Sequence, residues 1–274
     1  MLLAIGLMTG LILGLTGAGG SVFAVPLLML MAGLPITDAI GISLGAVAAT
    51  TLYGSARNLV QKNTSPVLWK PGIILASVGA ISAPFGKWLG LQVNELWLVS
   101  GFSLLAVIIA LRMWLSATKN PDAASVVRAG NFTQIPSPDA LCTLSKSGQF
   151  ELRPRCVSGL LIGGLFVGLL SGLFGVGGGF LIVPLLLALS AVSMAQAVST
   201  SLVIIALIST AGFTSHLVFA DTIPWHLLGL VVTGGIIGMV IGQMISHKIA
   251  NALLQKIFAV GLLIVAITTL LRFL

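Results

Sequence analysis

The sequence predicts an all-α polytopic integral membrane protein, built from two homologous repeats with about eight membrane segments in total. Of its 274 residues, 57% are hydrophobic and only 7% are charged, whereas a soluble domain carries about 25% charged residues. The mean hydropathy of +1.15 suits a lipid bilayer and not a water-exposed surface. The third observation is a repeated motif: GLTGAGGSVFAVPLL at Gly14–Leu28 returns 158 positions later as GLFGVGGGFLIVPLL at Gly172–Leu186.

The repeat extends well beyond this motif. In the same register, Ser43 corresponds to Ser201 and Gly54 corresponds to Gly212. Matches spread along one register are better evidence of duplication than one shared motif, because glycine-rich apolar segments resemble each other by chance. We therefore expect a first transmembrane repeat at residues 1–115 and a second at 155–274. The polar, proline-containing segment 116–154 is expected to be a cytoplasmic linker.

Each repeat is expected to contain one long apolar stretch followed by three simpler spans. The long stretch exceeds the roughly 20 residues that one spanning helix needs, yet it is too short for two full spans. We expect its glycine cluster to divide it into two shorter helices, because non-helical backbone at membrane depth must be buried in protein or line a cavity. The expected segments are Leu2–Ala32, Thr37–Leu59, Gly72–Leu89 and Leu96–Leu115, then Val157–Ala191, Ala195–Val218, Leu227–Ile245 and Ala252–Leu271.

Two arrangements of the divided stretches stay open. A re-entrant hairpin with the glycines at its tip leaves three crossings per repeat and inverts the second repeat, whereas a single broken crossing gives four crossings and parallel repeats. Lys and Arg gather on the linker side in both arrangements, by 11 to 2 for the hairpin and by 10 to 3 for the broken crossing, which predicts a cytoplasmic linker. In the hairpin arrangement the linker side holds Arg57, Lys62, Lys70, Arg112, Lys119, Arg128, Lys146, Arg153, Arg155, Lys248 and Lys256, and the other side holds Lys87 and Arg272.

The charged residues exclude some classes of function. The net charge of +7 does not indicate nucleic-acid binding, because the basic residues lie in loops and at span ends and form no stripe interleaved with aromatic residues. All six carboxylates also lie in loops or at span ends, so no carboxylate proton relay inside the membrane is visible. Lys87 is expected to snorkel towards the interface. Cys142 and Cys156 lack metal-ligand spacing, and a disulfide between them is disfavoured if the linker is cytoplasmic.

The two glycine clusters are the candidate binding site for a small anion. Glycine permits positive φ and a close approach of a ligand to the backbone. The helix after each cluster begins with unpaired N–H groups and the positive end of its dipole. Matched breaks in two repeats typically mark the binding site of a transporter, although the glycines would also permit close helix packing. The candidate substrate-binding residues of the clusters are Gly17, Gly19, Gly20, Ser21, Gly175, Gly177, Gly178 and Gly179.

Hydroxyl and basic side chains add secondary candidates. Hydroxyls early in the second span of each repeat would donate to an oxyanion, but hydrogen bonding to their own helix is an equal alternative. Basic or amide groups at the span ends would attract the anion or couple protons, although positive-inside topology or a solvated helix end explains them more simply. Thr51 and Ser209, deeper in the spans, are expected to be packing residues. The substrate-binding candidates of this kind are Ser43, Thr200 and Ser201, and the vestibule or coupling candidates are Arg57, Asn58 and His216.

The double glycine motif resembles a known family. Together with the strings Ala39–Leu44 and Ala197–Leu202, and with Arg57–Asn58 followed by Asn63, it is similar to the TauE/SafE family of sulfite and organosulfonate exporters. The resemblance covers nearly the whole chain apart from the linker and implies efflux of small sulfur-containing anions across the bacterial inner membrane. This chain departs from the pattern at Ser21, which replaces a glycine, and at a Gly-Ile-Ser in the first string where Gly-Thr-Ser is typical. The two halves are therefore expected to contribute unequally.

The expected function is a secondary transporter that exports sulfite or an organosulfonate, by electrogenic or weakly proton-linked efflux. The alternatives are an importer or channel for another small anion or solute and, less favoured, a membrane-embedded enzyme. We do not expect an enzyme, because the three histidines lie at helix ends without ligand spacing. A scaffold would not explain paired helix breaks, which are costly in lipid. The expected partners are a small anionic substrate and the lipid bilayer, with no nucleic acid, no cofactor and no metal.

Overall fold

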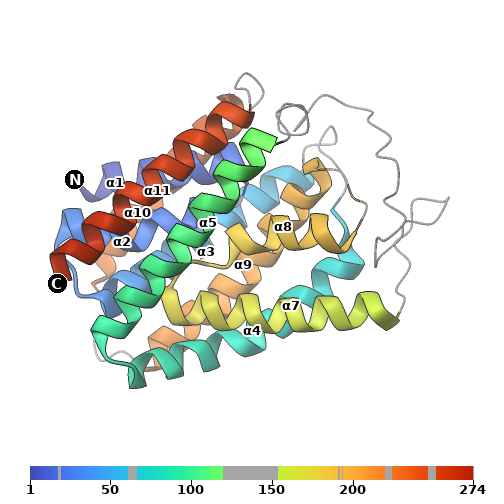
Figure 1. Cartoon of the computed structure of the whole chain (residues 1–274). Helices are drawn as coiled ribbons and strands as arrows, with labels where there is room; N and C mark the ends of the chain where they lie inside the picture. Colours follow the sequence, from blue (N-terminus) through green and yellow to red (C-terminus); the bar gives the residue numbers. More distant parts are fainter. Residues whose placement is uncertain are drawn as a thin grey trace.

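The computed structural model describes residues 1–17, 20–60, 67–119, 154–190, 192, 194–219, 224–245 and 251–273, and these residues form a bundle of helices (Figure 1). The expected all-α architecture is confirmed. Both long apolar stretches are divided at their glycine clusters, as the sequence predicts. Most of the linker and Gly19 lie outside the described residues. The helices are α1 (Leu2–Thr16), α2 (Ser21–Ala32), α3 (Ile36–Val60), α4 (Trp69–Gln92), α5 (Glu95–Lys119), α7 (Pro154–Phe174), α8 (Gly179–Leu189), α9 (Met194–Phe219), α10 (Trp225–Ile245) and α11 (Asn251–Phe273).

Each divided stretch folds back on itself as a helical hairpin. Gly159 and Gly163 of α7 pack against Leu189 and Leu185 of α8, respectively, with side-chain carbons 2.9 and 2.5 Å from where a Cβ on each glycine would lie. Positions that advance along α7 therefore meet positions that recede along α8, so the two helices are antiparallel. In the first stretch, Gly20 packs against the backbone of α1 in the same manner.

Two other helix pairs interlock through glycine. Gly10 and Gly14 of α1 approach the carbonyl oxygens of Gly235 and Met239 of α10 so closely that an added Cβ would overlap them. The numbers rise together along both helices, so α1 and α10 are parallel. Gly168 of α7 meets the backbone of α4 in the same way. Small residues allow such backbone contact, which stabilises helix pairs in lipid where burial of apolar surface contributes little.

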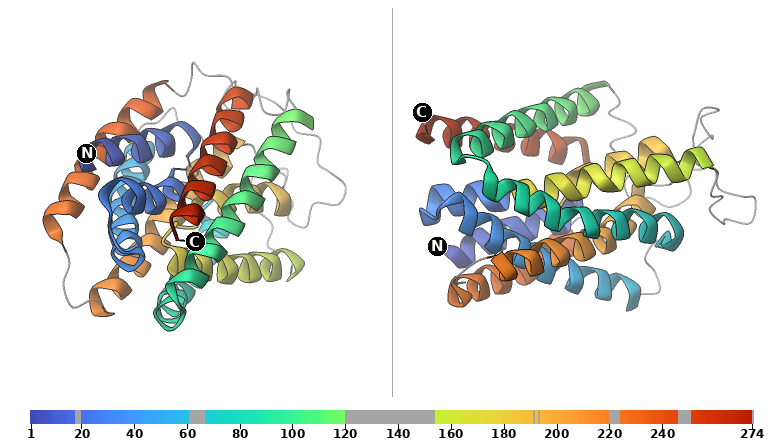
Figure 2. Two further views of the ribbon diagram at one scale, coloured as in Figure 1. Left: turned by 60° about the vertical axis from the view of Figure 1, so that its left-hand side comes forward. Right: turned by 90° about the horizontal axis from the view of Figure 1, so that it is seen from below.

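The long helices α3 and α9 pack against each other in opposite directions. Gly41 and Gly45 of α3 lie against His216 and Phe213 of α9, respectively, so the numbering rises along one helix as it falls along the other. Helices α5 and α11 lie side by side at the edge of the bundle (Figures 1 and 2). The main helix pairings follow the sequence repeat. Helix α1 packs against α10, and the helices at the corresponding positions, α7 and α4, also pack against each other. The corresponding helices α3 and α9 pair with each other, as do α5 and α11.

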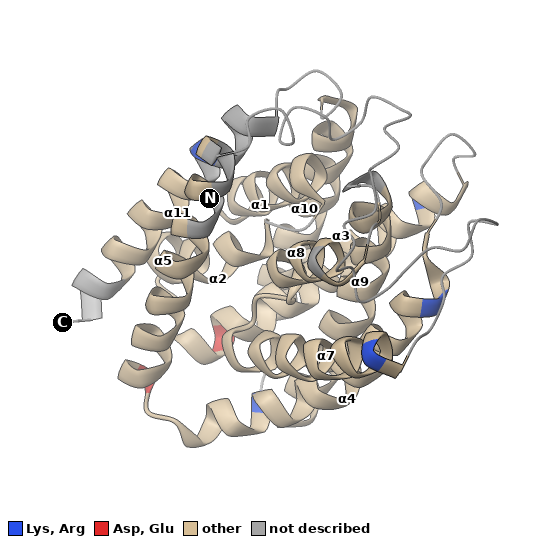
Figure 3. Cartoon of the chain, turned by 45° about the vertical axis from the view of Figure 1, so that its right-hand side comes forward, with Lys and Arg blue, Asp and Glu red and all other residues tan. Residues whose placement is uncertain are grey.

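Within the described residues, five helices are long and apolar enough to cross a membrane: α3, α4, α7, α9 and α10. The described apolar parts of α5 and α11, Glu95–Leu111 and Ala259–Thr269, are shorter, as are α1 and α2. Charged residues lie mostly near helix ends, with long uncharged stretches of helix between them (Figure 3). These features support a multi-pass membrane protein, and the figure of about eight segments stays a prediction.

Two findings depart from expectation. Lys87 is only 3% exposed, so its side chain is enclosed by protein and does not snorkel. Its ammonium group interacts electrostatically with Asp38 at the start of α3, and this attraction offsets part of the cost of burying the charge. Cys156, at the start of α7, is disulfide-bonded, whereas a cytoplasmic linker predicts a free thiol. Cys142 lies outside the described residues.

Candidate functional site

The second tip, Gly175–Gly179, turns the chain sharply between α7 and α8. Gly175, Gly177 and Gly178 have φ of +70°, +66° and +69°, a left-handed backbone that residues with a side chain rarely adopt. Gly178 is the N-cap of α8, and no side chain caps this helix start. The whole tip is buried. A buried helix start without a side-chain cap presents N–H groups to any anion that reaches it.

The first tip, Gly17–Ser21, has a different backbone. Gly17 has φ of +73°, and its N–H group donates a hydrogen bond to the Leu13 carbonyl oxygen over 2.7 Å. Gly20, the N-cap of α2, has a helical φ of −66°. Among the described residues of this tip, only Gly17 is left-handed, so the two tips are not equivalent. This agrees with the unequal halves that the sequence departures predict.

Each tip is contacted by one serine from the opposite half of the chain. Ser43 of α3 donates a hydrogen bond through Oγ to the Gly175 carbonyl oxygen over 2.9 Å. Its counterpart Ser201 of α9 points to the Gly17 carbonyl oxygen at 3.4 Å and donates to the Val198 carbonyl oxygen of its own helix at 2.8 Å. Both predicted serines therefore lie at the tips, and each contacts a tip carbonyl oxygen and not a tip N–H group.

Two further hydroxyls lie at the second tip, and sequence reasoning missed both. Ser209 Oγ lies 2.8 Å from where a Cβ on Gly177 would be, and Ser171 Cβ lies 3.6 Å from the corresponding point on Gly178. Both serines are 0% exposed, and neither Oγ atom has a hydrogen-bond partner. No sequence signal separates Ser209 from the adjacent Thr210, which donates a hydrogen bond within its own helix.

The remaining candidates lie away from the tips. Thr200 Oγ1 accepts a hydrogen bond over 3.0 Å from the N–H group of Leu68, the residue that precedes α4. Arg57 and Asn58 are half-buried in the last turns of α3. They lie 14 and 15 residues beyond Ser43, which is about 21 Å or more along a helix axis. The structure therefore does not bring these three residues to the glycine turns.

His216 belongs instead to a charged cluster with Asp38 and Lys87. These residues come from the start of α3, the end of α4 and the end of α9, and both the lysine and the histidine interact electrostatically with Asp38. His216 is 6% exposed, and its imidazole occupies space that a Cβ on Gly41 would fill. The buried ammonium group of Lys87 therefore lies near the start of α3, whereas Arg57 lies at the other end of that helix.

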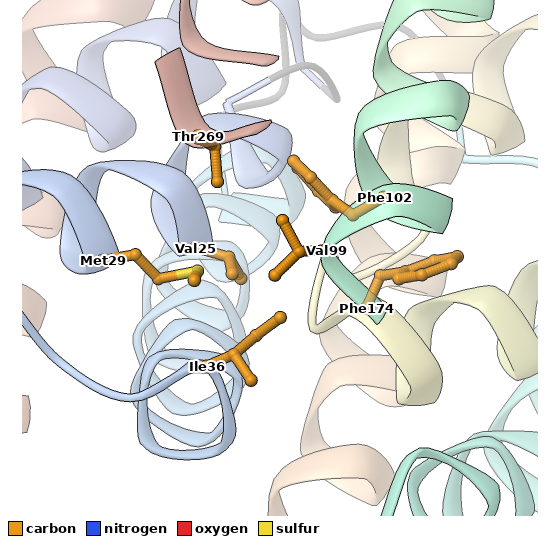
Figure 4. Close-up of a pocket in the computed structure, with 7 residues that line it drawn as sticks. All are labelled: Val25, Met29, Ile36, Val99, Phe102, Phe174 and Thr269. Carbon is orange, nitrogen blue, oxygen red and sulfur yellow. The ribbon is translucent and has the colours of Figure 1, made fainter. Parts of the chain in front are cut away.

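A small apolar cavity lies among α2, α3, α5, α7 and α11 (Figure 4). Its polar lining residue, Thr269, donates its hydroxyl to the Val265 carbonyl oxygen over 2.7 Å. Such a lining offers an anion no donors to replace its water, so this cavity is not a candidate anion site. The lining residues are Val25, Met29, Ile36, Val99, Phe102, Phe174 and Thr269.

The sequence of the whole bundle matches one known family. Residues 2–269 match the family described as "Sulfite exporter TauE/SafE". The chain belongs to the TauE/SafE family. The resemblance that the glycine motifs indicate is thereby confirmed, over a range that includes both tips of this TauE/SafE protein.

Curated relatives of this TauE/SafE protein are named as probable membrane transporters. It is 29% identical over 266 residues to a "Probable membrane transporter protein" of Xylella fastidiosa (strain 9a5c), covering 95% of this chain and 89% of that protein. It is 28% identical to "Probable membrane transporter protein YunE" of Bacillus subtilis (strain 168), covering 97% and 94%. It is 27% identical to a probable membrane transporter protein of Methanocaldococcus jannaschii, covering 95% and 92%. No solved structure is significantly similar to this chain.

The family and these names indicate that this TauE/SafE chain is a membrane transporter. Among the described residues, the second tip combines a break in the helical backbone with buried hydroxyl donors that have no partner. Such a site is chemically suited to holding an oxyanion by hydrogen bonds alone.

Proposed function

We propose that this transporter exports small sulfur-containing oxyanions, sulfite or an organosulfonate, and binds them at the tips of its two hairpins. The observation that carries the proposal is the uncapped, buried start of α8 at the second tip. Helix N–H groups attract an anion without a charged side chain. A site of this kind suits transport, because a permeating ion must be bound strongly enough to enter and weakly enough to leave.

The proposal includes a membrane topology in which each half has three crossings and one re-entrant hairpin, with the second half inverted. Three relationships support it: α7 and α8 are antiparallel, Gly20 returns to the backbone of α1, and α3 and α9 are antiparallel. In parallel repeats, the equivalent helices α3 and α9 would point the same way. Inverted repeats with broken helices at the midplane are a common design of secondary transporters.

The proposed topology places the linker in the cytoplasm and the protein in the bacterial inner membrane. Eleven of the 13 Lys and Arg residues then lie on the linker side, in accordance with the positive-inside rule. The disulfide at Cys156 opposes this orientation, because disulfides are rare in the cytoplasm. The charge bias rests on eleven basic residues spread along the chain, so the proposal follows the charge bias. Green fluorescent protein inserted in the linker should fluoresce, and alkaline phosphatase at the same point should be inactive; the opposite pair of results would reverse the orientation.

The membrane potential supplies a driving force for export. With the cell interior negative, moving one negative charge outward gains roughly 2.3 kcal/mol per 100 mV. This corresponds to about 50-fold accumulation outside at equilibrium, at roughly 1.4 kcal/mol per tenfold. Efflux of an anion therefore requires no proton relay, which is consistent with six carboxylates that lie in loops or at span ends.

Flux measurements in proteoliposomes test this function directly. Purified protein should move sulfite, or sulfoacetate among sulfonates, faster than thiosulfate and sulfate, and an imposed potential should change the rate. Flux that ignores the potential would reject electrogenic export. Selective flux of a different small solute would favour the importer or channel alternative, and absence of flux for all four anions would reject the proposed substrates.

A further inference from the structure

Two buried hydroxyls at the second tip have no hydrogen-bond partner. Ser209 of α9 directs its Oγ at Gly177, and Ser171 of α7 packs against Gly178. Both serines are 0% exposed. A serine in a helix ordinarily satisfies its hydroxyl by donating to its own backbone, as Thr210 does beside Ser209. A buried donor left without an acceptor is destabilising, so its presence calls for an explanation.

The equivalent positions of the first half do not carry this feature. Thr51 lies 158 positions before Ser209, and it donates its hydroxyl to the carbonyl oxygens of Val47 and Ala48, at 2.6 and 3.2 Å, in its own helix. Leu13 occupies the position that corresponds to Ser171. The first tip therefore has neither unpartnered hydroxyl. The backbone also differs between the two tips. The second tip has three left-handed glycines, and the described part of the first tip has one.

We propose that the second tip is the principal anion-binding half of the transporter, and that Ser209 and Ser171 donate hydrogen bonds to the bound oxyanion. This inference rests on the proposed function and specifies which residues perform it. The N–H groups at the start of α8, the Ser209 hydroxyl and the Ser171 hydroxyl come from three helices, α8, α9 and α7. Donors from three directions suit a group with three oxygens on one sulfur, such as sulfite or the –SO₃⁻ end of a sulfonate.

The same contacts explain why the tip is shut in the conformation described here. Beside Ser209, Val47 of α3 and Ile205 of α9 approach the position of a Cβ on Gly177 to 3.0 and 3.5 Å. These two side chains occupy corresponding positions of the two halves, 158 residues apart. The proposal therefore requires that α3 and α9 separate from the tip before an anion reaches the donors.

Sulfite binding to purified full-length protein, measured with radiolabelled sulfite and repeated with sulfoacetate, tests the inference. Ser209→Ala should weaken sulfite binding about tenfold or more, as expected for a lost hydrogen bond to a charged group, and Ser171→Ala should also weaken it. Thr51→Val is the matched control at the equivalent position of the first half. Ser55→Ala is a second control, because Ser55 is another buried, unpartnered serine and lies two helical turns beyond Val47 in α3. Both controls should stay within about twofold of the wild type.

Thermal unfolding distinguishes a variant that has lost sulfite binding from a variant that has lost its fold. Removing an unpartnered buried hydroxyl should leave the anion-free Tm of Ser209→Ala unchanged or higher, while the rise in Tm produced by sulfite should disappear. If Ser209→Ala binds sulfite as tightly as Ser55→Ala, or if Thr51→Val weakens binding equally, the assignment to the second tip is wrong although the proposed function stands. If the wild type binds neither sulfite nor sulfoacetate, the proposed function fails first.

Discussion

Ser43 donates a hydrogen bond to the carbonyl oxygen of Gly175, 132 residues further along the chain, over 2.9 Å. The corresponding pair in the other half, Ser201 and Gly17, is longer at 3.4 Å, and Ser201 also bonds within α9 at 2.8 Å. Each half thus supplies a serine to the glycine turn of the other half. The two contacts are equivalent in position and unequal in geometry.

This inequality predicts different costs of removing the two hydroxyls. Ser43→Ala should lower the free energy of unfolding by roughly 1 kcal/mol, the usual value for one lost hydrogen bond, and by more if the Gly175 carbonyl is left unpaired. Ser201→Ala should cost less, because its hydroxyl is shared with its own helix. Chemical or thermal unfolding in detergent measures both changes. A larger cost for Ser201→Ala would contradict the assigned geometry.

The left-handed backbone of the second tip predicts that Gly177 tolerates no side chain. Gly177→Ala would place a Cβ at positive φ, 2.8 Å from Ser209 Oγ and 3.0 Å from a Val47 methyl carbon, which strains the turn. Anion flux in proteoliposomes should fall at least about tenfold while the variant still inserts and remains monodisperse. The matched control is Gly229→Ala, because an added Cβ at Gly229 meets nothing within 4 Å. Equal flux for both variants would remove the tip from the transport site.

Glycine contacts between α1 and α10 predict a folding defect of a different kind. Gly10→Leu would force the side chain into the carbonyl oxygen of Gly235 and separate the two backbones, which removes the close packing that joins helices in lipid. The expected result is loss of the monodisperse peak in size-exclusion chromatography. Gly229→Leu, in α10 but facing open space, should retain that peak. If Gly10→Leu remains folded, the two helices do not pack through glycine.

The charged cluster predicts an energetic coupling between Asp38 and Lys87. Lys87→Met alone leaves Asp38 without its buried positive neighbour, and Asp38→Asn alone leaves the lysine uncompensated, so each should destabilise the protein. The double variant should lose less than the sum of the two, with an interaction energy of about 0.5–3 kcal/mol in a double-mutant cycle. Lys70, exposed near the start of α4, serves as the control, and Lys70→Met combined with Asp38→Asn should be additive.

The sequence predicted much of the fold because the relevant signals are local. Hydrophobic length identifies helices that suit a bilayer, and clusters of three or four glycines favour a break in a helix. The division of both long stretches, at Gly17 and at Gly175, follows from these rules. The membership in the TauE/SafE family follows from the same repeated motifs.

The sites were predicted less completely because partners depend on distant segments. Ser43 and Ser201 were singled out by their shared register, and both do reach the tips. Thr200, adjacent to Ser201, binds the N–H group of Leu68 just before α4 instead, and Lys87 is enclosed by protein rather than snorkelling. One residue along a helix rotates a side chain by about 100°, so neighbouring hydroxyls face different helices and only the packing decides which one meets a tip.

The sequence by itself determined a helical membrane protein of a transporter family, and it predicted a glycine break in each of two similar apolar stretches. The tertiary structure alone decided that each break is the turn of a hairpin, that α3 and α9 oppose each other, and that Ser209 points at Gly177. The physical reason is the range of the forces involved. Hydrophobicity and backbone freedom belong to individual residues, whereas the direction of a helix and the surroundings of a hydroxyl are set by contacts with residues on other helices.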